Sequence, residues 1–352
     1  MELTDLGFGG WFEKHSESLL QSGHRIARVT AVDRGAFLVR NQDTEMYAEL
    51  AGKFRFSVEA TIDLPCVGDW VCVQSHTSGG PAIIHGVLPR KTFLRRKCPG
   101  KTVDFQMIAG NIDVALIVQA CGYDFNLGRL DRYLVMISEG HIEPLIILSK
   151  TDLISPEELE ETISQIKRMG ISAQILALSN TTGFGLDDLR TILTSGKTYC
   201  LLGSSGVGKT TLINRLIGCD KFDTKAVSGT GEGVHTTARR QLLILDNGAM
   251  LIDTPGIREL GLLGTSAGLD NTFAEILEYS VNCRFANCTH TGEPGCAVLL
   301  AIENGILSDD RYQSYLKLKK EAEYHDLSYF EKRRKDRSFG RFIKSAKKSM
   351  KE

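Results

Sequence analysis

The sequence predicts a multidomain protein with a small N-terminal β-barrel, a central α/β domain and a C-terminal α-rich domain that binds a metal ion. Three observations lead to this prediction. Short β segments separated by turn residues fill residues 24–88, apolar strands alternate with helical patterns over residues 111–264, and three cysteines and a histidine gather at residues 283–296. A chain of 352 residues is long enough for two or three domains.

The first predicted domain is a barrel of five short strands. We expect them at Arg25–Thr30, Ala36–Val39, Met46–Leu50, Trp70–Gln74 and Ala82–Val87. Turn signals separate them, such as Ser78-Gly79-Gly80-Pro81 before the last strand. This spacing favours an OB-fold, with an SH3-like barrel as the alternative. OB-folds often bind oligonucleotides, so nucleic-acid binding is a hypothesis for this domain that the fold alone does not establish.

The central block alternates apolar strands with helices. We expect strands at Val114–Val118, Leu145–Leu148, Ala173–Leu178, Tyr199–Leu202, Leu242–Leu245 and Met250–Ile252. Helical patterns fall between several of them, at Leu127–Glu139, Pro156–Met169, Leu186–Leu193 and Lys209–Leu216. This alternation is typical of a parallel sheet covered on both faces.

A phosphate-binding loop follows one of these strands. Residues Gly203-Ser204-Ser205-Gly206-Val207-Gly208-Lys209-Thr210 match G-x-x-x-x-G-K-[ST] between a strand and a helix, which is the context that the motif requires. The glycines let backbone N–H groups face phosphate oxygens, and the helix N-terminus adds partial positive charge. Lys209 is expected on the β- and γ-phosphates and the Thr210 hydroxyl on Mg²⁺. Thr211, which directly follows the motif, is also expected to line the nucleotide site.

Two further segments extend the phosphate side of the site. In Asp253-Thr254-Pro255-Gly256, Asp253 can hold Mg²⁺ through water, and the Gly256 N–H can turn toward a γ-phosphate. A threonine between the two motifs can complete the Mg²⁺ shell when γ-phosphate is present. Thr236 and Thr237 are both candidates, and we favour Thr237.

The base is expected to be read by Ser149-Lys150-Thr151-Asp152 and by Ser179-Asn180, each of which follows a strand. The Asp152 carboxylate can accept hydrogen bonds from guanine N1–H and N2–H₂, a pair of donors that adenine lacks. Backbone N–H groups of residues 179–180 can face guanine O6. The pattern indicates a guanine nucleotide, although Ser149–Asp152 alone would also suit a helix N-cap.

The order of these motifs is similar to that of one family. In Ras-like GTPases the phosphate loop comes first, whereas here the base-reading motifs at 149–152 and 179–180 precede it. With the barrel before and the Cys/His cluster after, the chain resembles the RsgA (YjeQ) family of circularly permuted GTPases over residues 25–335. The expected division is an N-terminal extension (1–23), an OB-fold barrel (24–90), a basic linker (91–110), a circularly permuted P-loop GTPase domain (111–264), a zinc-binding domain with its helix (265–331) and a basic tail (332–352).

The resemblance implies a GTP hydrolase that acts late in maturation of the small (30S) ribosomal subunit, is stimulated by the subunit and then dissociates. It also implies a catalytic role for His235, beside Lys209 and Gly256, because Ile257 stands where Ras-like enzymes place a water-orienting glutamine. An ordinary loop histidine is the alternative. Two other functions stay open: an RNA-binding module in which nucleotide only sets conformation, and an ATP-dependent transport or metal-insertion factor.

Two base-reading residues depart from the family pattern. The first motif usually reads Asn-Lys-x-Asp, and Ser149 replaces an asparagine that braces the phosphate loop and touches guanine N7, so a lower nucleotide affinity is expected. The second usually reads Ser-Ala, and Asn180 replaces an alanine whose contact runs through the backbone, so little effect is expected.

Cys283, Cys288, His290 and Cys296 offer three thiolates and one imidazole. That is a closed tetrahedral set with no open position for catalysis. The segment is rich in Asn, Thr, Gly and Pro, so it is expected to need the metal in order to fold. The match with the family makes one structural Zn²⁺ the expected ion, and a redox or incidental cluster is the alternative.

The formal net charge of −1 conceals an uneven distribution. Residues 332–352 hold ten Lys or Arg and two acids, a net of +8, which leaves −9 for the rest. A second basic stretch, from Arg90 to Lys101, contains no acid. Such clusters are typical of phosphate-backbone binding, so rRNA of the small subunit is the expected partner besides GTP and GDP. A solvated tail is the alternative.

The remaining expectations concern location and assembly. No apolar run approaches the roughly 20 residues that span a bilayer, and the first residues show no signal peptide. Scattered cysteines are ordinary core residues in a reducing compartment. We therefore expect a cytoplasmic monomer that does not contact membranes.

Overall fold

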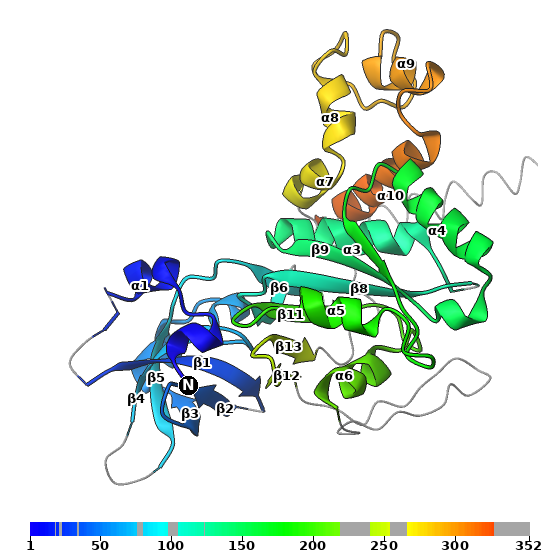
Figure 1. Ribbon diagram of the computed structural model, residues 1–352. Coiled ribbons are helices and arrows are strands. Elements are labelled where there is room, and N and C mark those ends of the chain that lie inside the picture. The colour runs from blue at the N-terminus through cyan, green and yellow to red at the C-terminus, as the bar shows by residue number, and fades with distance from the viewer. Residues whose placement is uncertain are drawn as a thin grey trace, which may run out of the picture.

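The computed structural model describes residues 1–17, 19–20, 23–33, 35–75, 80–97, 105–122, 124–218, 240–253 and 266–326. Figure 1 shows three parts: a barrel at the N-terminal end, a central sheet with helices, and a group of C-terminal helices. Among the described helices, none is long and apolar enough to cross a membrane.

The first part is a closed barrel of five strands: β1 (Arg25–Val32), β2 (Phe37–Arg40), β3 (Glu45–Leu50), β4 (Trp70–Gln74) and β5 (Ala82–Val87). Their order is β1-β2-β3-β5-β4, and β4 returns to pair with β1. β3 and β5 run parallel, while the other pairs are antiparallel. Helix α2 (Gly52–Ser57) lies between β3 and β4 along the chain. This five-stranded closure confirms the predicted OB-fold.

The second part is a largely parallel sheet of β8 (Val114–Ala120), β9 (Glu143–Ser149), β10 (Gln174–Ala177), β11 (Thr198–Leu202), β12 (Arg240–Ile244) and β13 (Met250–Asp253). Its order is β10-β9-β8-β11-β13-β12, and β12 alone among these strands runs antiparallel to its neighbour. Helices α3 (Leu127–Glu139) and α4 (Pro156–Arg168) pack on one face. Helices α5 (Leu186–Ile192) and α6 (Lys209–Ile217) pack on the other, so the prediction of a covered sheet is confirmed.

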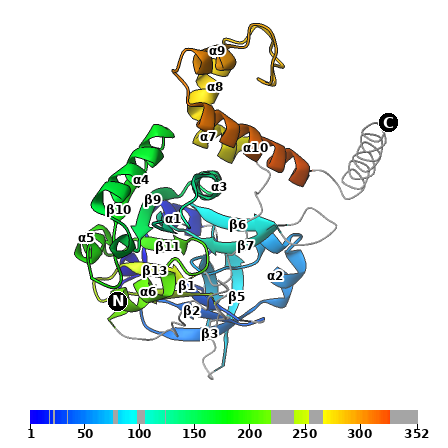
Figure 2. The ribbon, with the colours of Figure 1, turned by 90° about the vertical axis from the view of Figure 1, so that its right-hand side faces the viewer.

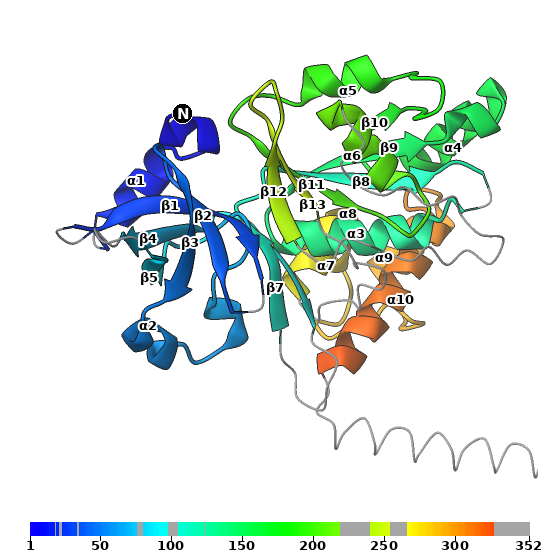
Figure 3. The ribbon, with the colours of Figure 1, turned by 90° about the horizontal axis from the view of Figure 1, so that it is seen from below.

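Strand β1 joins the barrel to the central sheet, as Figure 3 shows from below. Its first half pairs with β4, with Arg28 opposite Trp70, and its end pairs with β12, with Val32 opposite Arg240. The result is one sheet of eleven strands through both parts. The N-terminal helices η1 (Leu3–Leu6) and α1 (Gly10–Ser16) lie on this junction, where Phe8 meets Trp70 edge-on at 4.8 Å between ring centroids.

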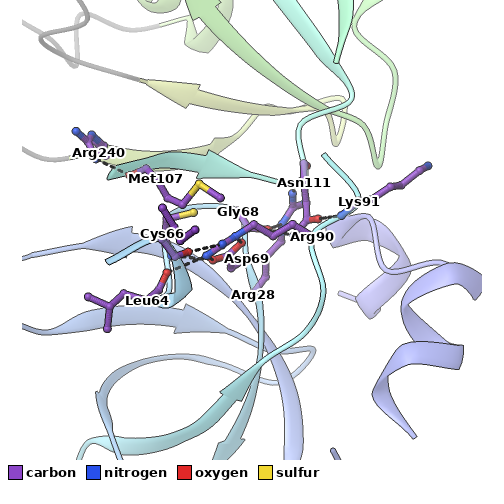
Figure 4. A network of polar contacts seen from close by, with 11 residues as sticks. Arg28, Leu64, Cys66, Gly68, Asp69, Arg90, Lys91, Met107, Asn111 and Arg240 are labelled. Carbon is purple, nitrogen blue, oxygen red and sulfur yellow. Dashed lines mark hydrogen bonds and ion pairs between the residues drawn. The ribbon is translucent and has the colours of Figure 1, made fainter. Parts of the chain in front are cut away.

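A buried ion pair of the barrel lies beside its junction with the central part (Figure 4). Arg90 makes a two-pronged contact with the fully buried Asp69, with Nε–Oδ1 and Nη2–Oδ2 distances of 2.8 Å. Asn111 Nδ2 donates to the Gly68 carbonyl oxygen at 3.1 Å. Gly68 has a φ of +90°, and a Cβ there would lie 2.1 Å from the carbonyl oxygen of Gly110. Only glycine fits this close approach of two backbones.

Residues 91–110, expected as a basic linker, contain an antiparallel pair of strands, β6 (Phe93–Lys97) and β7 (Phe105–Gly110). Arg95 of β6 forms an ion pair with Glu139 of α3, and Arg96 Nε donates to Gln106 Oε1 at 3.3 Å. With Arg90 paired to Asp69, three arginines of the basic stretch already have partners inside the protein. This stretch is therefore in large part a structural joint, because its strands place the arginines against α3 and the barrel.

The third part consists of α7 (Ser266–Thr272), α8 (Ala274–Ser280), α9 (Ala297–Glu303) and α10 (Asp309–Asp326) around its own apolar core. Figure 2 shows these helices standing above α3. Val135 of α3 belongs to their core, and Arg311 of α10 reaches Asp131 of α3, with Nη1–Oδ1 at 2.6 Å. α10 is a long charged helix within residues 265–331, where the sequence predicts one.

Candidate functional site

The predicted phosphate loop lies between β11 and α6, at the carboxyl edge of the central sheet. Gly203, Gly206 and Gly208 have φ values of +151°, +79° and +94°, a region that side-chain-bearing residues rarely adopt. Lys209 Nζ donates to the carbonyl oxygens of Gly203 at 2.8 Å and Ser204 at 2.6 Å. The ammonium group therefore lies over the concave side of the loop, where the motif requires it.

Asp253 ends β13, the strand next to β11 in the sheet. Burial raises the pKa of its carboxyl group, and the positive charge of Lys209 acts in the opposite direction. The fold thus brings Asp253 into the electrostatic range of the phosphate loop, as the sequence predicted. Its carboxylate and the Thr210 hydroxyl at the start of α6 are oxygen donors of the kind that Mg²⁺ prefers.

The base-reading segments lie at the ends of β9 and β10, which are neighbours in the sheet. Ser179 is fully buried, and its hydroxyl donates to Asp152 Oδ1 and accepts the N–H of Thr181 at 3.2 Å and of Thr182 at 3.1 Å. Lys150 has a left-handed backbone with a φ of +59°, which turns the chain after β9. The Asp152 carboxylate is thereby fixed at an exposed position where a base can reach it.

Both departures from the family pattern contact the phosphate loop. Ser149 Oγ is 2.7 Å from the carbonyl oxygen of Val207, and Asn180 Nδ2 is 3.1 Å from that of Gly208. The predicted base-reading and phosphate-binding segments, separate in the chain, therefore touch each other directly. Thr211 follows Thr210 in the first turn of α6.

The remaining predicted residues, Thr236, Thr237, His235 and Gly256, lie outside the described residues. One residue that the sequence reasoning did not single out is Asp124, whose Oδ2 accepts from Ser204 Oγ at 3.0 Å. Asp124 follows β8, the other neighbour of β11. Its place after a parallel strand of the nucleotide-binding sheet is the signal that could have identified it.

The Cys/His cluster forms a compact set of four ligand atoms, all within 4.8 Å of one another. Cys283 Sγ is 3.6 Å from His290 Nδ1 and 3.9 Å from Cys296 Sγ, and Cys296 Sγ is 3.4 Å from His290 Nδ1. A tetrahedral ion with Zn–S and Zn–N bonds of about 2.3 and 2.0 Å would separate its ligands by roughly 3.5–3.8 Å, so the set fits.

The surroundings of the cluster favour metal binding. Burial lowers the pKa of His290, and Lys319 lowers it further, so the imidazole is neutral and free to bind an ion near pH 7. The backbone carbonyl of His290 accepts a hydrogen bond from the hydroxyl of Tyr312 in α10. The cluster can therefore hold a metal ion. The Tyr312 hydrogen bond ties the loop that carries His290 to α10.

Comparison with known sequences agrees with this geometry. The sequence model of the family described as RsgA GTPase matches residues 87–263. The small ribosomal subunit biogenesis GTPase RsgA of Syntrophotalea carbinolica is 39% identical over 91% of this chain and 90% of its own. The small ribosomal subunit biogenesis GTPase RsgA 2 of Lactiplantibacillus plantarum is 39% identical over 88% of this chain and 86% of its own.

Solved structures show the same architecture. YjeQ from Thermotoga maritima is 26% identical with a TM-score of 0.63, covering 85% of this chain and 98% of that one. YloQ, described as a circularly permuted GTPase, is 25% identical with a TM-score of 0.61, covering 87% of this chain and 97% of that one. The family model covers half of the chain and these relatives match most of it, so the chain belongs to the RsgA family of circularly permuted GTPases.

Proposed function

We propose that this protein hydrolyses GTP while bound to the small ribosomal subunit during the subunit's late maturation, and that hydrolysis drives its release. The observation that carries the proposal is the meeting of three segments at one edge of the central sheet. Asp152 lies where a guanine can be read, Lys209 lies over the phosphate loop, and Asp253 ends the adjoining strand. The names of the relatives support the small subunit as partner.

Each site residue has a proposed role. Asp152 selects guanine, with Lys150 and Thr151 beside it and the backbone of residues 179–180 near O6. Residues 203–211 hold the phosphates. Thr210, Thr237 and Asp253 would hold Mg²⁺, which neutralises charge on the phosphates when bound. The Gly256 N–H binds the γ-phosphate, and His235 orients the attacking water.

The Cys/His cluster is proposed to hold one structural Zn²⁺, since its four ligands leave no open position. The basic tail at residues 332–352 is proposed to bind rRNA. Both features suit a protein that attaches reversibly to a ribosomal particle as a monomer. Because the proposed partner is a ribosomal subunit, we also propose a cytoplasmic location without membrane contact.

The test is phosphate release from GTP with and without purified small subunits, at two salt concentrations. We expect stimulation by the subunit that weakens at high salt, because neutralised phosphates release counterions. Lys209→Ala should abolish phosphate release. Lys197→Ala, a change at an exposed lysine directly before β11, should leave phosphate release unchanged. If adding small subunits did not raise phosphate release, an RNA-binding module would be favoured. If ATP competed with GTP equally well for the site, an ATP-dependent factor would be favoured.

A further inference from the structure

Side chains from both base-reading segments hold consecutive carbonyl groups of the phosphate loop. Ser149 Oγ donates to the Val207 oxygen at 2.7 Å, and Asn180 Nδ2 donates to the Gly208 oxygen at 3.1 Å. We call these two hydrogen bonds the braces. The Gly208 oxygen also accepts the N–H of Leu212 at 2.9 Å, so both of its lone pairs are used.

Serine at position 149 can hold only one of these carbonyl groups. Its side chain is fully buried, and its hydroxyl carries a single proton. The carbonyl oxygen of Gln119 lies 3.2 Å from Ser149 Oγ, so it competes with Val207 for that proton. A carboxamide carries two N–H donors and would not face this limit.

We propose that Asn180 is a positioning residue of the nucleotide site, and that it supplies to the phosphate loop the carboxamide that position 149 lacks. A planar peptide points its carbonyl oxygen and the following N–H in opposite directions. Holding the carbonyl groups of Val207 and Gly208 therefore turns the N–H groups of Gly208 and Lys209 toward the bound phosphates. This inference rests on the proposed function as a guanine-nucleotide site.

The loop that carries Asn180 is built to present it. The preceding Ser179 is fully buried and its hydroxyl donates to Asp152, so Asn180 directly follows a residue that is bonded to the base-reading carboxylate. A Cβ on Gly208 would lie 2.8 Å from Asn180 Nδ2, so the amide reaches the loop because residue 208 is glycine. Asn180 Oδ1 is buried without a hydrogen-bond partner among the described residues, and turning the amide over would set that oxygen against the Gly208 carbonyl.

The test compares GDP affinity and GDP dissociation rate for four full-length proteins: the natural chain, Asn180→Ala, Ser149→Asn and the double variant. Asn180→Ala should weaken GDP binding about fivefold, the effect of one lost hydrogen bond, chiefly through faster dissociation. The double variant should return to within about twofold of the natural chain, because the carboxamide moves to position 149. Equal GDP affinity of Asn180→Ala and the natural chain, or a double variant weaker than either single one, would overturn the inference.

GMP distinguishes a brace on the loop from a general loss of structure. GMP lacks the β-phosphate that the braced N–H groups face, so Asn180→Ala should weaken GMP binding by less than twofold. Equal losses for GMP and GDP would contradict a role on the phosphate loop.

Asn180→Asp, which keeps the shape and sets an oxygen against the Gly208 carbonyl, should weaken GDP binding at least as much as Asn180→Ala. If the natural chain bound no guanine nucleotide, the proposed function itself would fail, whereas unchanged affinity in Asn180→Ala would remove this inference alone.

Discussion

Arg311 contributes a buried ion pair to the attachment of the metal-binding part to the central domain. Arg311 Nη1 lies 2.6 Å from Asp131 Oδ1, its Nε lies 2.8 Å from Glu275 Oε1, and its guanidinium group lies 4.0 Å from the centroid of the Phe273 ring. Asp131 is 0% exposed. Arg311→Ala would therefore leave a buried carboxylate without its counter-charge, which costs about 3–5 kcal/mol.

Hydrogen exchange of the zinc-loaded protein measures this cost locally. We expect faster exchange in residues 266–326 and in α3, with the rest of the described chain unchanged. Arg190→Ala is the matched control, because Arg190 pairs with Asp187 at an exposed position and its loss should cost at most about 1 kcal/mol. The reasoning is refuted if Arg311→Ala alters exchange no more than Arg190→Ala does.

The same variant has a defined pH dependence. Burial raises the pKa of Asp131, and Arg311 acts against that rise, so removing Arg311 raises the pKa further. The folded variant then binds a proton that the unfolded chain releases, and its stability falls as pH rises. The deficit relative to the natural chain should therefore grow as the pH rises above the already raised pKa of Asp131 in the natural folded protein. A deficit that shrinks with rising pH would contradict this assignment.

Three further predictions concern the metal, the thiols and the joint between barrel and central domain. Cys283→Ser should abolish binding of one Zn²⁺ and increase proteolysis within residues 266–326, measured by metal analysis and limited digestion. Burial raises the pKa of Cys200 to about 12, so at pH 8 mass spectrometry after iodoacetamide should find this thiol unlabelled in the native protein and labelled in urea. Gly68→Ala should lower the free energy of unfolding by about 1–3 kcal/mol more than Gly170→Ala, because both have positive φ but only Gly68 faces a backbone oxygen within 4 Å.

The fold follows closely from local patterns in the sequence. The strands Trp70–Gln74 and Ala82–Val87 and the helix Leu127–Glu139 have the predicted bounds, because apolar periodicity and turn residues act over a few neighbours. The pairing of β1 with β12 did not follow, since its partners lie far apart in the chain. The strand pair in residues 91–110 was missed for a different reason: its basic composition suggested a linker, whereas Arg95 is paired with Glu139 of α3, a residue far away in the chain.

The candidate site likewise has features that local sequence patterns predict and features that depend on contacts between distant segments. The sequence by itself determined the chemistry: the phosphate loop, Asp152 and the Cys/His cluster are short contiguous motifs whose residue types and spacing specify their ligands. The tertiary structure alone decided how these motifs meet. Asn180 was expected to matter little, yet it contacts Gly208, because parallel strands end at one edge of the sheet and bring distant loops together there. A side-chain contact between two loops depends on that shared edge, which no local pattern encodes.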